Sequence, residues 1–249
     1  SFEFSNQLQT VEIYTPNRDA SGNFVGLNHE AIFYDPEAFV EPIRIVRNTW
    51  TASAVESEIM KQLIEGPLCT KAEIVDIDEN AMFTGLADGS LDLVTELWPS
   101  GVVADEQAFI DNGSIVNVGE LGSVGQIGWF VPDYVVADNP SLATWEGLKD
   151  AELAKQFATA ETGDLGRFLG TDPSYSQVDE PLIANLELPF KVVFSGSEAA
   201  TVAEIDSAVA DNKPIIMYWW TPTAAVGKYD LVEVKLPEYT PGCQDDIPN

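Results

Sequence analysis

Short apolar runs alternate with longer amphipathic stretches along most of the chain. From Pro42 onward this pattern predicts a strand at 43–46, a helix at 53–64 that starts near Thr51, a strand at 72–77, a helix at 80–88 and a strand at 91–95. Gly66 and Pro67 end the first of these helices. Strands that alternate with helices favour an α/β fold with a parallel sheet and right-handed crossovers.

The second half of the chain continues the alternation after a glycine-rich stretch. Gly122, Gly125 and Gly128 lead into 129–132, where we expect the chain to cross into a second lobe. Beyond it the pattern predicts helices at 142–150, 151–156 and 180–186, a loop at 162–175 and a strand at 191–194. The first 41 residues stand apart, with strands expected at 10–14 and 31–34 around a turn-rich segment.

The segment 195–229 carries the strongest indication of function. A helix beginning at Ser197 and Glu198 precedes 214–220, an apolar run without alternation that predicts a strand buried on both faces. Thr221 and Pro222 stop this strand at its carboxyl end. Open α/β sheets bind ligands at that end of their strands, and here it carries a tyrosine and two tryptophans.

These residues resemble the substrate-binding proteins of ABC importers for glycine betaine, choline and related quaternary amines. The family pattern of G-S-E-A-A, a helix, a hydrophobic strand, W-T-P and then K-Y-D-L is matched at 196–200, 220–222 and 228–231. The segments 85–99 and 128–134 also resemble family blocks, the first of them ending in Trp98 and Pro99. The resemblance covers about residues 42 to 243.

The resemblance implies a two-lobed, periplasmic-binding-protein-like (type II) fold with parallel or mixed sheets and a hinge. It places lobe 1 at 42–121 and lobe 2 at 122–236, with an N-terminal extension at 1–41 and an acidic tail or return crossing at 237–249. Family members continue with helices that complete lobe 1. We therefore expect that residues 1–41 replace this completion or that the chain is part of a longer polypeptide.

A quaternary ammonium group has no N–H to donate, so a protein holds it through aromatic faces and nearby carboxylates. Motif matching places Trp98 and Trp220 on opposite sides of such a ligand, one from each lobe. Tyr175 or Phe168 is the candidate for a third wall, and Trp50 is another candidate. For Trp50 and for the remaining tryptophans, which are Trp129, Trp145 and Trp219, packing in the core is the alternative interpretation.

A ligand carboxylate would need donors of its own. The backbone N–H groups of Thr51 and Ala52 at a helix start are suited to an anion. Relatives often carry a histidine just after W-T-P, but Thr223 and Ala224 stand there in this chain, so the sequence does not assure a ligand with a carboxylate. Glu96 is expected to face a cation or a hydroxyl such as that of choline.

Composition narrows the function further. The formal net charge of −29 repels nucleic acid and would attract a cation, although it also fits simple solubility in a salty or extracellular medium. The patterns GxSxG, HExxH and GxxxxGK[ST] do not occur, so we expect no enzyme and no cofactor.

The two cysteines, Cys69 and Cys243, are too far apart in sequence for a CxxC metal site. They are predicted either to form a disulfide or to be separate buried thiols.

Two functions remain open at this point. The first is an extracytoplasmic protein, periplasmic, cell-surface or secreted, that captures a small quaternary amine and presents it to the membrane subunits of an ABC importer. The second is a binding-protein-like domain recruited as a structural or sensory module of a larger extracellular assembly. An aromatic cavity closed by both lobes would favour the first, and a filled or open cavity would favour the second.

Overall fold

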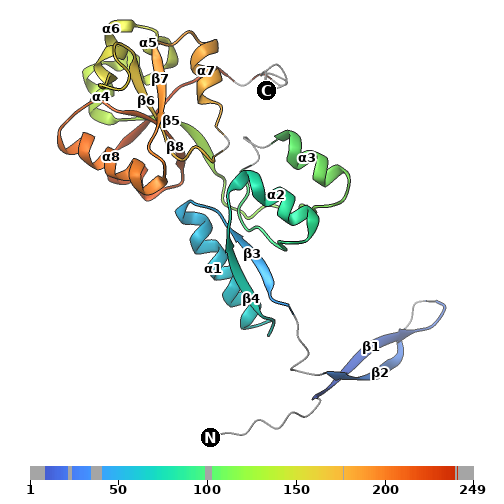
Figure 1. Cartoon of the computed structure of the whole chain (residues 1–249). Coiled ribbons are helices and arrows are strands. Elements are labelled where there is room, and N and C mark those ends of the chain that lie inside the picture. The colour runs from blue at the N-terminus through green and yellow to red at the C-terminus, as the bar shows by residue number, and fades with distance from the viewer. Residues whose placement is uncertain are drawn as a thin grey trace, which may run out of the picture.

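The computed structural model describes residues 9–21, 24–34, 41–98, 103–175, 177–238 and 240 of the 249-residue chain (Figure 1). The N-terminal strands are β1 Gln9–Arg18 and β2 Phe24–Tyr34. They form an antiparallel hairpin, which contains the two strands expected at 10–14 and 31–34, and Figure 1 shows it apart from the rest of the molecule.

The first lobe contains two paired strands and three helices, namely β3 Ile43–Arg47, α1 Thr51–Glu65, β4 Ala72–Asp76, α2 Glu79–Asp88 and α3 Val103–Asp111. The strands pair in parallel, with Ile45 opposite Ile74. Ile45 and Val46 are fully buried, and Val46 packs with Met82 and Phe83 of α2. On α1, by contrast, Val55, Ile59 and Leu63 remain about half exposed.

The third strand expected at 91–95 is wrong as a full strand, because only Leu93 forms a parallel bridge, to Ile45. The Asp92 carboxylate accepts a hydrogen bond from the backbone N–H of Arg44 at 2.8 Å and another from its guanidinium group. A continued ladder would need that N–H for a backbone carbonyl. The side chain of Asp92 therefore replaces part of the ladder.

The second lobe is built on a five-stranded sheet in the order β7-β6-β8-β5-β9. Its elements are β5 Gln126–Pro132, α4 Asp133–Asp138, η1 Pro140–Ala143, α5 Trp145–Leu148, α6 Ala151–Ala154, η2 Lys155–Phe157, β6 Gly166–Gly170, α7 Asp179–Asn185, β7 Phe190–Phe194, α8 Glu198–Ala210, β8 Ile216–Thr221, α9 Ala224–Lys228 and β9 Leu231–Val234. Strand β6 runs parallel to β7 and β8, whereas β5 runs antiparallel to β8 and β9. The sheet is therefore mixed.

Strand β8 is buried along nearly its whole length, as its unbroken apolar run predicted, and helix α8 begins at the expected cap, where the Ser197 side chain accepts the N–H of Ala200. Strands β8 and β5 form the centre of the second-lobe core, in which Trp219, Phe168 and Met217 are fully buried. Among the described residues, none of the helices has the length and apolar content needed to cross a membrane.

The prediction of a loop at 162–175 is wrong, because the middle of this segment forms β6 inside the sheet. Glycines bound this strand and made it look like a loop. A Cβ at Gly166 or Gly170 would lie 2.6 Å from a ring atom of Phe190 or Phe194, respectively. The glycines therefore let the aromatic side chains of β7 lie against the neighbouring strand.

The single helices expected at 142–150 and 151–156 are also wrong, since each divides into shorter pieces. Thr144 is extended, with a φ of −138°, and forms a parallel bridge with Lys235. The backbone N–H of Trp145 donates to the carbonyl of Lys235 at 2.9 Å. This pairing with the end of β9 separates η1 from α5.

Cys69 is exposed, so the prediction of a buried thiol is wrong for this residue. Cys243 lies outside the described residues, and a disulfide between the two cysteines stays a prediction. The expected boundaries of the lobes and the hinge also stay predictions.

Candidate ligand-binding site

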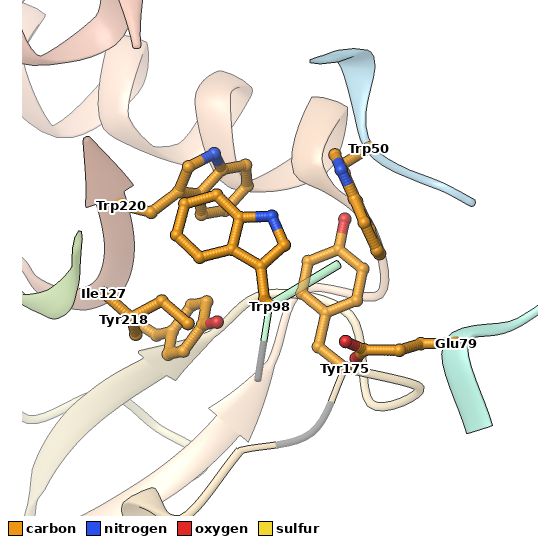
Figure 2. A pocket seen from close by; sticks show the side chains of 7 residues that line it. All are labelled: Trp50, Glu79, Trp98, Ile127, Tyr175, Tyr218 and Trp220. Atoms are coloured by element: carbon orange, nitrogen blue, oxygen red, sulfur yellow. The ribbon is translucent and has the colours of Figure 1, made fainter. Parts of the chain in front are cut away.

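A cavity lies where the two lobes meet, and aromatic side chains form most of its wall (Figure 2). Its empty space is about 370 Å³, including solvent-open space. The lining residues are Trp50, Glu79 and Trp98 from the first lobe and Ile127, Tyr175, Tyr218 and Trp220 from the second. Four of the residues that the sequence nominated, Trp50, Trp98, Tyr175 and Trp220, thus surround one cavity.

Strand β8 supplies one wall of the cavity. Tyr218 and Trp220 are two residues apart, which directs both side chains to the same face of the strand. Their ring centroids are 6.2 Å apart. Ile127 of β5 lies opposite Trp220 in the antiparallel register and reaches the same cavity.

Trp219 supports this wall from within the core. It is 1% exposed, its ring stacks on that of Trp220 with centroids 4.5 Å apart, and its indole N–H donates to the Thr223 hydroxyl at 2.8 Å. Trp219 is therefore a packing residue of the core. So is Trp129, whose ring centroid lies 4.7 Å from that of Phe168 and whose indole N–H donates to the Asp179 carboxylate. The ring of Trp145 lies 4.9 Å from the ammonium of Lys149, away from the cavity lining.

Tyr175 reaches the cavity from a tight turn at 172–175. The backbone N–H of Tyr175 donates to the carbonyl of Asp172 at 3.1 Å, and the Asp172 side chain accepts the N–H of Ser174 at 2.9 Å. Asp at the first and Pro at the second position are typical of such a turn. The Tyr175 ring contacts Trp50 at 5.5 Å and Trp220 at 6.1 Å, measured between centroids.

Phe168, the alternative to Tyr175 as a third wall, is not part of the cavity. It lies in the middle of β6, is 0% exposed and packs against Trp129 in the core. The prediction that it lines the site is therefore wrong, because the segment that carries it is a central strand and not a loop.

One carboxylate holds two of the cavity tryptophans. The indole N–H of Trp50 donates to Glu96 Oε2 at 2.8 Å, and that of Trp98 donates to Glu96 Oε1 at 2.7 Å. Both oxygens of Glu96 thus have indole partners, and Glu96 itself is outside the cavity lining. Its position is that of a residue that orients the cage walls.

Gly125 lies against the other end of the Trp98 ring. A Cβ at this position would lie 2.1 Å from Cη2 of Trp98. Only glycine therefore leaves room for the ring in its present position.

The start of α1 already has a carboxylate partner, which is a side chain of the protein itself. The backbone N–H and the hydroxyl of Thr51 donate to the same Glu198 carboxylate oxygen, at 2.7 and 2.9 Å. Trp50 occupies the N-cap position without a capping side chain of its own. Glu198, from α8 of the second lobe, thus supplies the partner that we expected of a ligand carboxylate. Ala52 is exposed and does not line the cavity.

Further contacts join the lobes next to the cavity. The Thr49 hydroxyl donates to Asp172 Oδ2 at 3.2 Å, and the side-chain amide of Asn80 donates to the carbonyl of Ser174 at 3.2 Å. With the Thr51 to Glu198 contact, they connect the start regions of α1 and α2 to the turn that carries Tyr175 and to the start of α8.

The electrostatics of the lining favour a positively charged group. Glu79, which is 5% exposed, is the one acidic side chain among the seven lining residues, and none of the seven is basic. Burial raises the pKa of Tyr175 and of Tyr218 above the usual range, so both hydroxyls stay protonated at neutral pH. Near the site, burial and then the neighbouring Glu96 raise the pKa of Glu56 to about 7.

Sequence reasoning missed three lining residues, which are Tyr218, Ile127 and Glu79. The period of a strand would have found Tyr218 from Trp220, because residues i and i+2 share a face. Ile127 depends on the register between β5 and β8, and Glu79 depends on how the lobes meet. No group of three or more His, Cys, Asp or Glu side chains within the described ranges is arranged to hold a metal ion.

Comparison with known proteins gives consistent results. The family model described as the substrate binding domain of ABC-type glycine betaine transport system (OpuAC) matches residues 41–247. A trimethylamine N-oxide-binding protein of Pelagibacter ubique is 26% identical over 216 residues, which cover 83% of this chain and 67% of that protein. A glycine betaine/proline betaine-binding periplasmic protein of Escherichia coli is 25% identical over 187 residues, which cover 71% of this chain and 54% of that protein.

The chain thus spans about two thirds and about half of the lengths of these two relatives. Among solved structures, the glycine betaine and L-proline-binding protein ProX of Borrelia burgdorferi superposes with a TM-score of 0.65 at 20% identity, over 79% of this chain and 69% of that one. This likeness shows the fold of the type II periplasmic binding proteins and confirms the fold class predicted from the sequence.

Proposed function

Because the chain belongs to the family of substrate-binding domains of ABC-type glycine betaine transport systems, we propose that it captures a small quaternary amine in the aromatic cavity between its lobes. The observation that carries this proposal is the convergence of Trp50, Trp98, Tyr175, Tyr218 and Trp220 on one cavity, with rings contributed by both lobes. The ligands we propose are glycine betaine, choline and similar compounds.

The chemistry of the lining fits such a ligand. A trimethylammonium group presents methyl groups with a diffuse positive charge and offers no N–H donor. Aromatic faces satisfy both properties, since each contact with a desolvated cation contributes about 0.5 to 2 kcal/mol. Glu79 adds a carboxyl group to the wall of the same cavity. A neutral apolar ligand would not need a buried carboxylate in the wall.

The contribution of both lobes suggests how binding is coupled to transport. Trp50 and Trp98 belong to the first lobe, and Tyr218 and Trp220 belong to the second. A ligand between them contacts both lobes at once and so favours their closed arrangement over any more open one. We propose that this arrangement is presented to the membrane subunits of an ABC importer, outside the cytoplasm, and that the protein has no catalytic role.

The cavity also bears on the alternative function, that of a recruited structural or sensory module. That function predicted a cavity that is filled or open. Rings from both lobes instead line the cavity, and Thr49 and Thr51, on either side of Trp50 in the sequence, donate hydrogen bonds to the second lobe. We therefore do not favour the recruited module.

Isothermal titration calorimetry with glycine betaine, choline and trimethylamine N-oxide tests the proposal. We expect saturable one-to-one binding of at least one of these amines to the full chain, weakened at least tenfold by Trp220→Ala. Trp145→Ala is the matched control, because Trp145 lies outside the cavity lining, and it should leave the affinity unchanged. Absence of binding by all three amines to the folded protein would contradict the proposal.

A further inference from the structure

One turn of the second lobe receives two side chains of the first lobe. The Thr49 hydroxyl donates to Asp172 Oδ2, where the turn begins, and the side-chain amide of Asn80 donates to the carbonyl of Ser174, each at 3.2 Å. The turn ends at Tyr175, whose ring lines the cavity. We refer to residues 172–175 as the Tyr175 turn.

The first-lobe residues that contact the Tyr175 turn are sequence neighbours of cavity walls. Thr49 directly precedes Trp50, and Asn80 directly follows Glu79, and both of these neighbours line the cavity. The ring centroid of Trp50 lies 5.5 Å from that of Tyr175, and Figure 2 shows the two side chains next to each other. The hydrogen bonds between the lobes therefore hold the Tyr175 ring beside the walls of the first lobe.

The two carboxylate oxygens of Asp172 have different roles in this arrangement. Oδ1 accepts the backbone N–H of Ser174 at 2.9 Å and its hydroxyl at 2.7 Å, both within the turn. Oδ2 accepts the Thr49 hydroxyl from the first lobe. One side chain thus both shapes the turn that presents Tyr175 and receives the first lobe. Because Asp172 is only 9% exposed, loss of the Thr49 donor leaves part of a buried carboxylate without this partner, which is unfavourable.

Hydrogen bonds between the lobes act on the closed arrangement alone, because their donors and acceptors belong to different lobes. A ligand enters before the lobes meet, so these bonds have little influence on the rate of association. It leaves when the lobes separate, and separation requires that the bonds break. Bonds of this kind therefore slow dissociation.

We propose that Asp172 is a positioning residue that couples closure of the lobes to the aromatic wall, with the Thr49 hydroxyl as its donor from the first lobe. The bond between them holds the lobes together and, through the same carboxylate, fixes the Tyr175 turn. Neither side chain is among the seven lining residues, so both act through the turn and not by contact with the ligand. The inference rests on the proposed function and adds to it the residues that determine how long a bound amine stays.

Stopped-flow tryptophan fluorescence with choline and with glycine betaine separates the two rate constants. Thr49→Val removes the donor and keeps a side chain of similar shape, and Thr49 is exposed, so the fold should persist. We expect the dissociation rate constant to rise roughly fivefold or more, while the association rate constant stays within about twofold of the wild-type value. Thr49→Ser restores a hydroxyl and should return dissociation to within about twofold of the wild type.

A double-mutant cycle tests whether Thr49 acts through Asp172. Asp172→Ala removes the acceptor together with the bonds inside the turn, so it should speed dissociation at least as much as Thr49→Val. In the Asp172→Ala background, Thr49→Val should add less than about a twofold change, because its partner is already absent. Circular dichroism checks that each variant is folded, and the Thr49 variants decide the question if Asp172→Ala is not.

Thr70→Val is the matched control, since the Thr70 hydroxyl donates to the Leu68 carbonyl of its own lobe at 3.1 Å. It should leave both rate constants unchanged. Wild-type dissociation in Thr49→Val, failure of Thr49→Ser to restore it, or an undiminished effect of Thr49→Val without the Asp172 carboxylate would overturn the inference and leave the proposed function intact. Failure of choline, glycine betaine and trimethylamine N-oxide to bind the wild-type chain would overturn the proposed function, and the inference with it.

Discussion

The indole of Trp50 donates its N–H to the carboxylate of Glu96 at 2.8 Å, although 46 residues separate them in sequence. The other oxygen of the same carboxylate accepts the N–H of Trp98 at 2.7 Å. Two walls of the cavity thus share one anchor within the first lobe. Walls that are fixed before the ligand arrives lose less conformational freedom on binding, which raises affinity.

Replacing Glu96 by Gln should weaken ligand binding while the protein stays folded. A Gln side chain has one acceptor oxygen and one NH2 group, so it can accept from only one of the two indoles. Loss of one such hydrogen bond costs about 0.5 to 1.5 kcal/mol, and we expect choline affinity in calorimetry to fall roughly two- to tenfold. An affinity equal to that of the wild type, with an unchanged circular dichroism spectrum, would show that the anchor is not needed.

The role of the Tyr175 ring can be separated from that of its hydroxyl. Tyr175→Leu removes an aromatic face and should weaken choline and tetramethylammonium alike, by roughly two- to thirtyfold. Tyr175→Phe keeps the ring and should weaken choline more than tetramethylammonium, which has no hydroxyl to lose. The measurement is a pair of titrations for each variant. Equal effects of Tyr175→Phe on both ligands would argue against a contact between the two hydroxyls.

Gly125 should be sensitive to the smallest possible substitution. The added Cβ of Gly125→Ala would lie 2.1 Å from the Trp98 ring, so the ring has to move out of its place in the cavity wall. We expect choline affinity to fall at least tenfold. Gly227→Ala is the control, because a Cβ there has no neighbour within 4 Å in α9 and should leave binding unchanged. Wild-type affinity in Gly125→Ala would mean that the Trp98 position does not determine binding.

Asp179 should make the stability of the second lobe depend on pH. Asp179 is 5% exposed, and burial raises its pKa to about 6, against the effect of its hydrogen bond from Trp129. Well below pH 4 the carboxyl group is protonated in both the folded and the unfolded chain. Between about pH 4 and 6 the folded chain keeps a proton that the unfolded chain has released, so the free energy of unfolding falls as the pH rises. Well above pH 6 the carboxyl group is charged in both states, and the full free-energy cost of burying this charge is present.

Asp179→Asn tests this prediction, because Asn is neutral at every pH and can still accept from Trp129. The unfolding free energy of the variant minus that of the wild type should increase between pH 4 and 6, by on the order of 1 to 3 kcal/mol, and then level off. Urea unfolding at several pH values measures this difference. A difference that does not change with pH would contradict the prediction.

The sequence predicted those parts of the site that depend on local pattern and motif. Trp220 ends a buried strand, Trp98 ends a motif of the family, and Tyr175 closes an Asp-Pro-Ser-Tyr turn, all of which can be recognised from neighbouring residues. The strand period would also have added Tyr218. Strand β6 was missed because the glycines at its two ends make room for aromatic rings of β7, which belongs to a different segment of the chain.

The contacts between the lobes could not be predicted in this way. Thr51 and Glu198 are 147 residues apart, and no periodicity relates them. The sequence indicated donors for a ligand carboxylate at the start of α1, because free N–H groups follow from the helix itself. It could not indicate that the partner of these groups is a side chain of the second lobe, since this depends on the placement of one lobe against the other.

The most direct test of the central claim is a crystal structure with (2-bromoethyl)trimethylammonium, a choline analogue whose bromine gives an anomalous signal. We expect one strong anomalous peak in the cavity, with the trimethylammonium group in contact with the rings of Trp50, Trp98, Tyr175 and Trp220. A peak at a different surface, or an empty cavity at saturating concentrations of the analogue, would contradict the claim that these residues form a quaternary amine site.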